Sequence, residues 1–271
     1  MCYTPAMHVQ LLRLALGLYS VGLLHSVFTI LRKKQTLFKP AVVATLVGFA
    51  CHAASIAINA YELQTFTLSQ RYESFSFFAA LAVLAFLLVY WKYKIASLAV
   101  FAFPAIFVMT FIANLAYSSQ DSVPEMLRSR WIYIHTPLVI LGYVAFFVAF
   151  SAAVLYLIQE RELKLKRVFY NRLPSLELCD DLAYRALAIG FPLMTLGILS
   201  GALWAQQVWG LVWMSDPKIL LAFLTWLIYL LLIHYRLIAG WRGKKFAYLA
   251  IAGFVGVLVT FSLRGLHSFN P

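Results

Sequence analysis

The chain has 271 residues, of which 63% are hydrophobic and only 12% are charged. Soluble domains carry roughly a quarter charged residues, and disordered chains are poor in apolar residues, so both classes are excluded. The net charge is +12, but apolar stretches separate the basic residues, which excludes a continuous nucleic-acid-binding patch. The composition therefore indicates a protein whose partner is the lipid bilayer.

Eight stretches contain no Asp, Glu, Lys or Arg, and each is long enough for one membrane-spanning helix but not for two. In chain order they are residues 14–31, 40–61, 74–91, 95–120, 131–159, 186–215, 219–235 and 246–263. In lipid each segment must satisfy its own backbone hydrogen bonds, so we expect helices. The predicted fold is an all-α polytopic membrane protein with eight transmembrane helices, forming one membrane-embedded domain over residues 1–271.

The loops between these stretches predict the orientation. Sixteen of the 22 Lys and Arg residues fall in the loops after the first, third, fifth and seventh stretches, and five fall on the opposite side. This bias places the first set of loops in the cytoplasm and both termini outside, in an inner or plasma membrane. Residues 160–184, which carry mixed charge, indicate an extension of the fifth helix, and a solvated linker is the alternative. Residues 1–8 lack the basic segment of a signal peptide, so we expect none.

The histidines, unlike the acids and lysines, occur inside predicted spans and at their outer ends. The six are His8, His25, His52, His135, His234 and His267. His25, His52 and His234 lie within spans, where an ionisable side chain indicates a functional site. Neutral imidazole is a ligand for heme iron, and histidines at matched depths suggest two ligand pairs. The alternative for each histidine is a hydrogen bond across a helix interface.

A tryptophan-rich segment lies between the sixth and seventh spans, on the predicted outer side. It contains Trp204, Trp209 and Trp213, and it ends at Asp216-Pro217. Tryptophan is common at membrane interfaces, so an aromatic belt is one explanation. An interfacial segment whose indole rings offer a planar surface also suits an extended aromatic ligand such as a porphyrin.

These residues resemble the cytochrome c assembly protein family, which comprises heme-handling membrane proteins of the CcsA, CcmC and HemX kind. The family's outer WWD motif has the form W-G-x-x-W-x-W-D-P-K. Here it reads Trp-Gly-Leu-Val-Trp-Met-Ser-Asp-Pro-Lys over residues 209–218, with Ser215 where the family has Trp. Segments around the four expected ligands, at 48–52, 131–143, 225–234 and 266–269, resemble the family's histidine segments in the same order.

The resemblance implies roles for individual residues. His135 and His267 are expected to be the axial ligands of a heme b at the outer site, and His52 and His234 to ligate heme within the membrane. The outer pocket is expected to be lined by Trp204, Trp209, Trp213 and Asp216. The implied function is to carry heme from the membrane to this outer site and present it for attachment to apocytochrome c.

The partners implied are heme, apocytochrome c and a second membrane protein with an outer domain. Whether the chain is itself part of a heme lyase or synthase complex stays open, as does the choice between one heme site and two. The alternative within the family is a HemX-type protein that modulates heme biosynthesis without ligase activity. A membrane cytochrome b and a solute transporter are further alternatives. We expect structural roles for His8 and His25.

Overall fold

In the computed structural model, every helix expected from the sequence is present in the part of the chain that the structure describes. That part comprises residues 7–32, 38–63, 68, 71–117, 129–166, 173–210 and 217–262. The elements are α1 (Met7–Arg32), α2 (Phe38–Glu62), α3 (Arg71–Tyr93), the short 3₁₀ helix η2 (Ala96–Leu98), α4 (Ala99–Ala116), α5 (Arg130–Lys164), α6 (Leu176–Trp209), α7 (Pro217–Ile238) and α8 (Lys244–Ser262). Within these ranges, eight helices are long and apolar enough to cross a membrane, and no strand is present. The predicted all-α, eight-span class is thereby confirmed.

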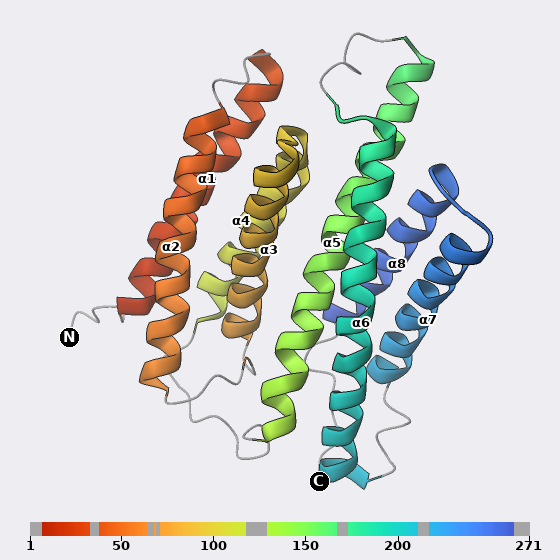
Figure 1. Ribbon diagram of the computed structural model, residues 1–271. Helices are drawn as coiled ribbons and strands as arrows, with labels where there is room; N and C mark the ends of the chain where they lie inside the picture. Colours follow the sequence, from red (N-terminus) through yellow and green to blue (C-terminus); the bar gives the residue numbers. More distant parts are fainter. Residues whose placement is uncertain are drawn as a thin grey trace. The chain divides into compact units, whose positions relative to one another are not determined.

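The chain divides into two compact units. Unit 1 comprises residues 1–123 with α1 to α4, and unit 2 comprises residues 124–271 with α5 to α8 (Figure 1, red to yellow and green to blue). That the two form a single domain over residues 1–271 stays a prediction.

Unit 1 has an aromatic core at one end of its helices. Helix α1 packs against α2 and α4, and α3 packs against α4 and α2. The rings of Phe38, Phe86 and Phe103 contact one another in series, with centroids 6.5 and 5.0 Å apart. All three are buried, so burial of aromatic surface holds this end of the unit together.

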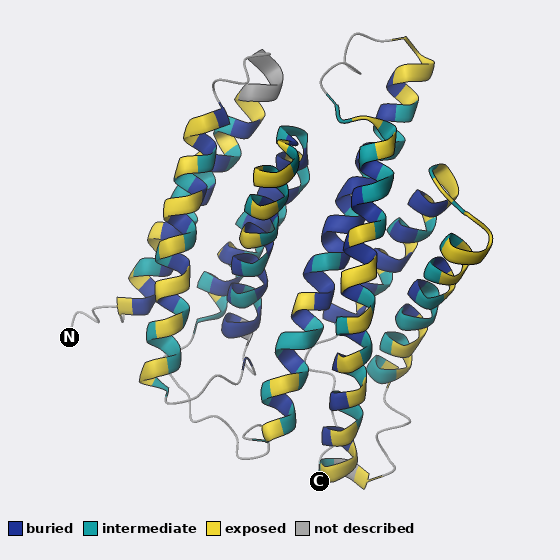
Figure 2. Cartoon of the chain, in the orientation of Figure 1, coloured by how far each residue is buried: buried dark blue, intermediate teal, exposed yellow. Residues whose placement is uncertain are grey.

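Unit 2 is organised around the long antiparallel pair α5 and α6. Helix α5 is the most buried span and also packs against α8, as its dark blue face shows (Figure 2). The ring of Phe146 stacks on Tyr229 of α7 at 3.8 Å between centroids.

Helix α5 ends at Lys164, and Ser175 caps α6, whose first residue is Leu176. The predicted extension of the fifth helix is therefore short, because the Ser175 side chain starts a new helix inside the expected loop.

Small residues allow α5 and α6 to approach closely. A methyl group built on Gly190 of α6 would lie 2.7 Å from the Phe146 ring, and one on Gly142 of α5 would lie 3.2 Å from the backbone nitrogen of Met194. Close backbone approach is how helices gain packing energy where the solvent is itself apolar.

This packing predicts that Gly190→Ala destabilises the protein by about 1–3 kcal/mol, because the new methyl group overlaps the Phe146 ring. Gly17→Ala on α1 is the matched control, since its methyl group would meet nothing within 4 Å. Thermal unfolding in detergent measures both changes. Equal stability of the two variants would show that the close approach of α5 and α6 has little energetic importance.

Candidate functional site

His52 lies on α2 and is fully buried within unit 1. Its Nδ1 is 3.2 Å from the hydroxyl of Tyr19 on α1, and its Nε2 is 2.8 Å from the hydroxyl of Ser76 on α3. Both ring nitrogens therefore have hydrogen-bond partners on neighbouring helices. For His52 to bind iron, one of these hydrogen bonds must first be given up.

His135 lies in the second turn of α5, and its imidazole is held by α6. Its Nδ1 is 2.7 Å from the carbonyl oxygen of Gly197. Because a carbonyl oxygen only accepts hydrogen bonds, Nδ1 carries the proton and Nε2 carries the lone pair. Metal-ligating histidines are oriented in this way, by a carbonyl or carboxylate on the other nitrogen.

A second glycine makes room for the His135 ring. A methyl group built on Gly201 would lie 2.6 Å from both Cε1 and Nδ1 of His135. Gly197, which supplies the carbonyl, and Gly201, which supplies the space one turn further along α6, form what we call the glycine cradle. Only a residue without a side chain at position 201 leaves this space for an imidazole.

Trp204 follows the glycine cradle on the next turn of α6 and is buried. Trp209 is the last residue of α6, and Gly210, with φ +59°, caps the helix in a backbone conformation that favours glycine. Figure 1 shows the start of α5 and the end of α6 at the same end of unit 2. The structure therefore places His135 and Trp204 at one end of unit 2; that they share a heme site stays a prediction.

Several predicted site residues are not placed by the structure. His267, Trp213 and Asp216 lie outside the described residues. His234 lies near the end of α7 and is exposed, with its ring edge-on to Tyr235 at 5.8 Å. His52 belongs to unit 1 and His234 to unit 2, so their pairing stays a prediction. The pairing of His135 with His267 stays a prediction as well.

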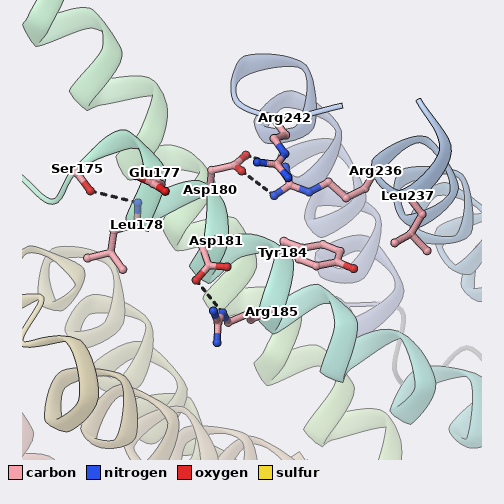
Figure 3. Close-up of a pocket in the computed structure, with 10 residues that line it drawn as sticks. All are labelled: Ser175, Glu177, Leu178, Asp180, Asp181, Tyr184, Arg185, Arg236, Leu237 and Arg242. Carbon is pink, nitrogen blue, oxygen red and sulfur yellow. Dashed lines mark hydrogen bonds and ion pairs between the residues drawn. The ribbon is translucent and has the colours of Figure 1, made fainter. Parts of the chain in front are cut away.

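The opposite end of unit 2 holds an ion pair that sequence reasoning missed. Arg236 of α7 donates from both terminal nitrogens to Asp180 of α6, at 3.0 and 2.7 Å (Figure 3). The backbone nitrogen of Gly243 also donates to Asp180, at 2.7 Å. The guanidinium lies between the rings of Tyr184 and Phe246, 4.9 and 5.0 Å from their centroids. We call this group the Asp180 clamp, because it joins α6, α7 and the turn before α8.

A surface pocket of about 680 Å³ opens beside the Asp180 clamp. Its charged lining residues are Glu177, Asp180, Asp181, Arg185, Arg236 and Arg242. Arg185 donates to Asp181 at 2.7 Å, so two of the three arginines are paired with carboxylates (Figure 3). The acidic and basic residues that line the pocket are equal in number, so the pocket favours neither an anionic nor a cationic ligand. The sequence places all of these residues near the predicted cytoplasmic ends of their helices but gives no sign of the pairing.

The fold and the site define a multi-pass helical membrane protein with histidines inside its helix bundles. Residues 68–268 match the family described as "Cytochrome C assembly protein", and the chain belongs to this family. The predicted resemblance is thereby confirmed.

Curated relatives agree with this assignment. The chain is similar to the "Cytochrome c biogenesis protein CcsA" of Guillardia theta, with 32% identity over 251 residues, covering 82% of this chain and 83% of the relative. The protein of the same name from Chlorella vulgaris is 34% identical over 262 residues, with the same two coverages. That from Prochlorococcus marinus (strain MIT 9301) is 34% identical over 236 residues, covering 76% of each chain.

The Asp180 clamp predicts that Asp180→Asn lowers stability by about 3–5 kcal/mol, because it leaves the guanidinium of Arg236 buried without a counter-charge. The Arg236 and Asp180 side chains are 8% and 13% exposed, so solvent screens the pair little. Asp181→Asn is the control: its partner Arg185 is exposed, so the loss stays below about 1 kcal/mol. Thermal unfolding compares the two, and similar losses would contradict the structural importance of the clamp.

Proposed function

We propose that this protein handles heme b in cytochrome c biogenesis, carrying heme from the membrane to an outer tryptophan-rich site and presenting it for attachment to apocytochrome c. The observation that carries the proposal is the glycine cradle, which holds His135 by Nδ1 and leaves the lone pair on Nε2. The names of the curated relatives support the biological setting, because each is called a cytochrome c biogenesis protein.

The residues of the outer site fit heme as a cargo. Heme iron takes neutral imidazole as an axial ligand, and the Gly197 carbonyl fixes the tautomer of His135 that can serve. The buried indole of Trp204, one turn beyond the cradle, supplies aromatic surface for a porphyrin. In this proposal His267 is the second axial ligand, and Trp209, Trp213 and Asp216 complete the pocket.

The membrane site is built differently, which suits a transient role. His52 is fully hydrogen-bonded within unit 1 and would take iron only after losing the Ser76 or Tyr19 hydroxyl. Such a hydrogen bond contributes about 0.5–1.5 kcal/mol, which bond formation with iron readily offsets. We propose that His52, with His234 as the second ligand, receives heme on its way to the outer site.

The protein's contribution to attachment is positioning. The heme vinyl groups react with the cysteine thiols of the apocytochrome, and holding both reactants in place makes this reaction effectively intramolecular. Cys2, Cys51 and Cys179 are scattered along the sequence and form no C-x-x-C motif. We therefore assign ligation to a complex with a second membrane protein, whose outer domain holds the apocytochrome beside the bound heme. The complex lies in an inner or plasma membrane, with both termini of this chain outside.

One alternative function has support from the residues. A HemX-type protein that modulates heme biosynthesis needs no ligase activity, and Ser215 replaces a tryptophan of the outer motif. The hydrogen bonds on both nitrogens of His52 also fit a structural role. Transfer of bound heme to an apocytochrome in a reconstituted system separates the two functions, since only the heme-presenting protein supports it.

The first prediction is that the detergent-purified protein contains heme b, which a reduced-pyridine spectrum identifies. Removing the outer ligands in His135→Ala/His267→Ala, or the membrane ligands in His52→Ala/His234→Ala, lowers the heme content or changes the visible spectrum. The pair with the larger effect locates the resting heme. His25→Ala is the control, because His25 belongs to neither pair. A protein without heme in every preparation, even with heme supplied during expression, would refute the ligand assignments.

The second prediction tests the glycine cradle. Gly201→Ala places a methyl group against the His135 ring and should weaken heme binding at the outer site by about 10–100-fold, as changes beside a metal-ligating histidine do. Gly17→Ala on α1 is the control, because the added methyl group would meet nothing within 4 Å. Heme titration with the Soret band as readout measures both. Unchanged heme binding in Gly201→Ala would contradict the assignment of His135 as a heme ligand.

A further inference from the structure

The pocket beside the Asp180 clamp, which we call the clamp pocket, lies where charged residues border the apolar spans. Arg185 directly precedes the uncharged stretch of α6, and Arg236 directly follows that of α7. Both side chains line the pocket. Charged side chains that border a span of about 20 apolar residues lie at the depth of the lipid headgroups. The clamp pocket is therefore at headgroup depth, at the end of unit 2 that we predict to be cytoplasmic.

Ion pairing within the clamp pocket leaves one acid and one base over. Two of the three carboxylates that line it are paired with two of the three arginines, as described above. The remaining two residues are Glu177 and Arg242. Both are exposed, and neither makes a hydrogen bond or an ion pair with any residue that the structure describes. The pocket thus offers one carboxylate and one guanidinium group to a ligand.

The position of Arg242 is fixed through its two neighbours in the chain. The carbonyl oxygen of Trp241 accepts a hydrogen bond from Arg236 at 3.1 Å. The backbone nitrogen of Gly243 donates to Asp180 at 2.7 Å. Figure 3 shows the Arg242 side chain reaching toward the Asp180 clamp from the turn before α8. Because Asp180 is already paired with Arg236, Arg242 adds a positive charge that the clamp does not neutralise.

The Glu177 carboxylate lies on the capped first turn of α6. The Ser175 hydroxyl accepts a hydrogen bond from the backbone nitrogen of Leu178 at 3.2 Å, which holds this turn. Glu177 and Arg242 therefore reach the clamp pocket from two different elements, each held by hydrogen bonds (Figure 3). A site on ordered elements loses little conformational freedom when it binds a ligand.

The two unpaired groups select a ligand that carries both signs of charge. An anion would pair with Arg242 but bring a like charge to Glu177, and a cation would do the reverse. Phosphate accepts paired hydrogen bonds from a guanidinium group, and a primary ammonium group has three N–H donors for carboxylate oxygens. A phosphate ester joined to a primary amine therefore satisfies both residues at once.

Apolar side chains adjoin the clamp pocket. Leu237 lines it and is 66% exposed, and Ile189, one turn beyond Arg185 on α6, is 61% exposed. Such exposed apolar surface is favourable only against other apolar groups, which the acyl chains of a lipid supply. A soluble zwitterion would leave these side chains uncovered. The surroundings of the pocket therefore favour a lipid as the source of the headgroup.

We propose that the clamp pocket binds the headgroup of phosphatidylethanolamine, with its phosphate on Arg242 and its ammonium group on Glu177. The pocket volume of about 680 Å³ is in the range of small-molecule sites. Phosphatidylglycerol has no ammonium group for Glu177, and the trimethylammonium group of phosphatidylcholine has no N–H donor. The bound lipid joins the first turn of α6 to the turn before α8, beside the Asp180 clamp.

Lipid binding to the delipidated full chain in detergent, without heme, tests this site by native mass spectrometry. Phosphatidylethanolamine, phosphatidylglycerol and phosphatidylcholine with identical acyl chains are titrated separately. We expect phosphatidylethanolamine to bind about 10-fold more tightly than either of the others, because a hydrogen bond to a charged group is worth about one decade of affinity. Equal binding of the three lipids, or a preference for phosphatidylglycerol, overturns the proposal.

Two variants test the two halves of the site. Glu177→Gln should abolish the preference for phosphatidylethanolamine over phosphatidylglycerol, whereas Arg242→Gln should weaken the binding of both lipids about 10-fold. A general loss of structure would not change the preference between lipids. Arg161→Gln is the matched control, since Arg161 is exposed on α5 and does not line the pocket. An unchanged preference in Glu177→Gln, or an equal loss in Arg161→Gln, contradicts the assignment.

Phosphoethanolamine without acyl chains distinguishes a lipid from a soluble ligand. We expect it to displace the lipid only at a concentration far above that of the lipid, because it makes no contact with the apolar side chains. Displacement at equal concentration would identify a soluble zwitterion as the ligand and overturn the lipid assignment. The measurement needs no heme, so its result does not depend on the function proposed above.

Discussion

A polar group inside an apolar helix bundle is costly until it finds a partner, and three of the described histidines show which partners a bundle supplies. Water cannot supply the missing hydrogen bond, and each unsatisfied group costs several kcal/mol in lipid. His52 meets the requirement with two hydroxyls from two other helices. His135 meets it with a backbone carbonyl of the neighbouring helix, and His8 with a carboxylate that reaches the surface.

The kind of partner determines what each histidine can do next. A carbonyl or carboxylate fixes one nitrogen as the donor and leaves a lone pair on the other, which is the arrangement of a ligand or a base. Hydroxyl groups both donate and accept, so they hold His52 without fixing its tautomer. In the proposed function, His135 is therefore the prepared ligand, and His52 is the ligand that must first be released from its hydroxyl partners.

Close packing of α5 and α6 is the condition on which the proposed outer heme site depends. Gly197, whose missing side chain makes room for Val139 of α5, also supplies the carbonyl that orients the His135 ring. Gly201 leaves the space that the ring occupies. Helix packing and the proposed heme ligation are therefore coupled at Gly197 and Gly201. At the other end of unit 2, the Asp180 clamp joins α6 to α7, which carries His234, and to the turn before α8.

The sequence by itself determined the eight helices, because an apolar run of about 20 residues in lipid has no other stable structure. It also determined the family, since the tryptophan motif and the order of the histidine segments are visible in the residues alone. It did not show the start of α6 at Leu176, where the Ser175 cap divides a charged segment that reads as continuous.

Only the tertiary structure decided the partners of the side chains. Each of these partners lies between 24 and 66 residues away along the chain. The pairs are His52 with Tyr19 and Ser76, His135 with Gly201, His8 with Glu62, and Arg236 with Asp180. Helix periodicity relates residues a few positions apart, so it carries no information about contacts between helices. Those contacts depend on how the helices pack, and packing is decided by the fit of whole surfaces in three dimensions.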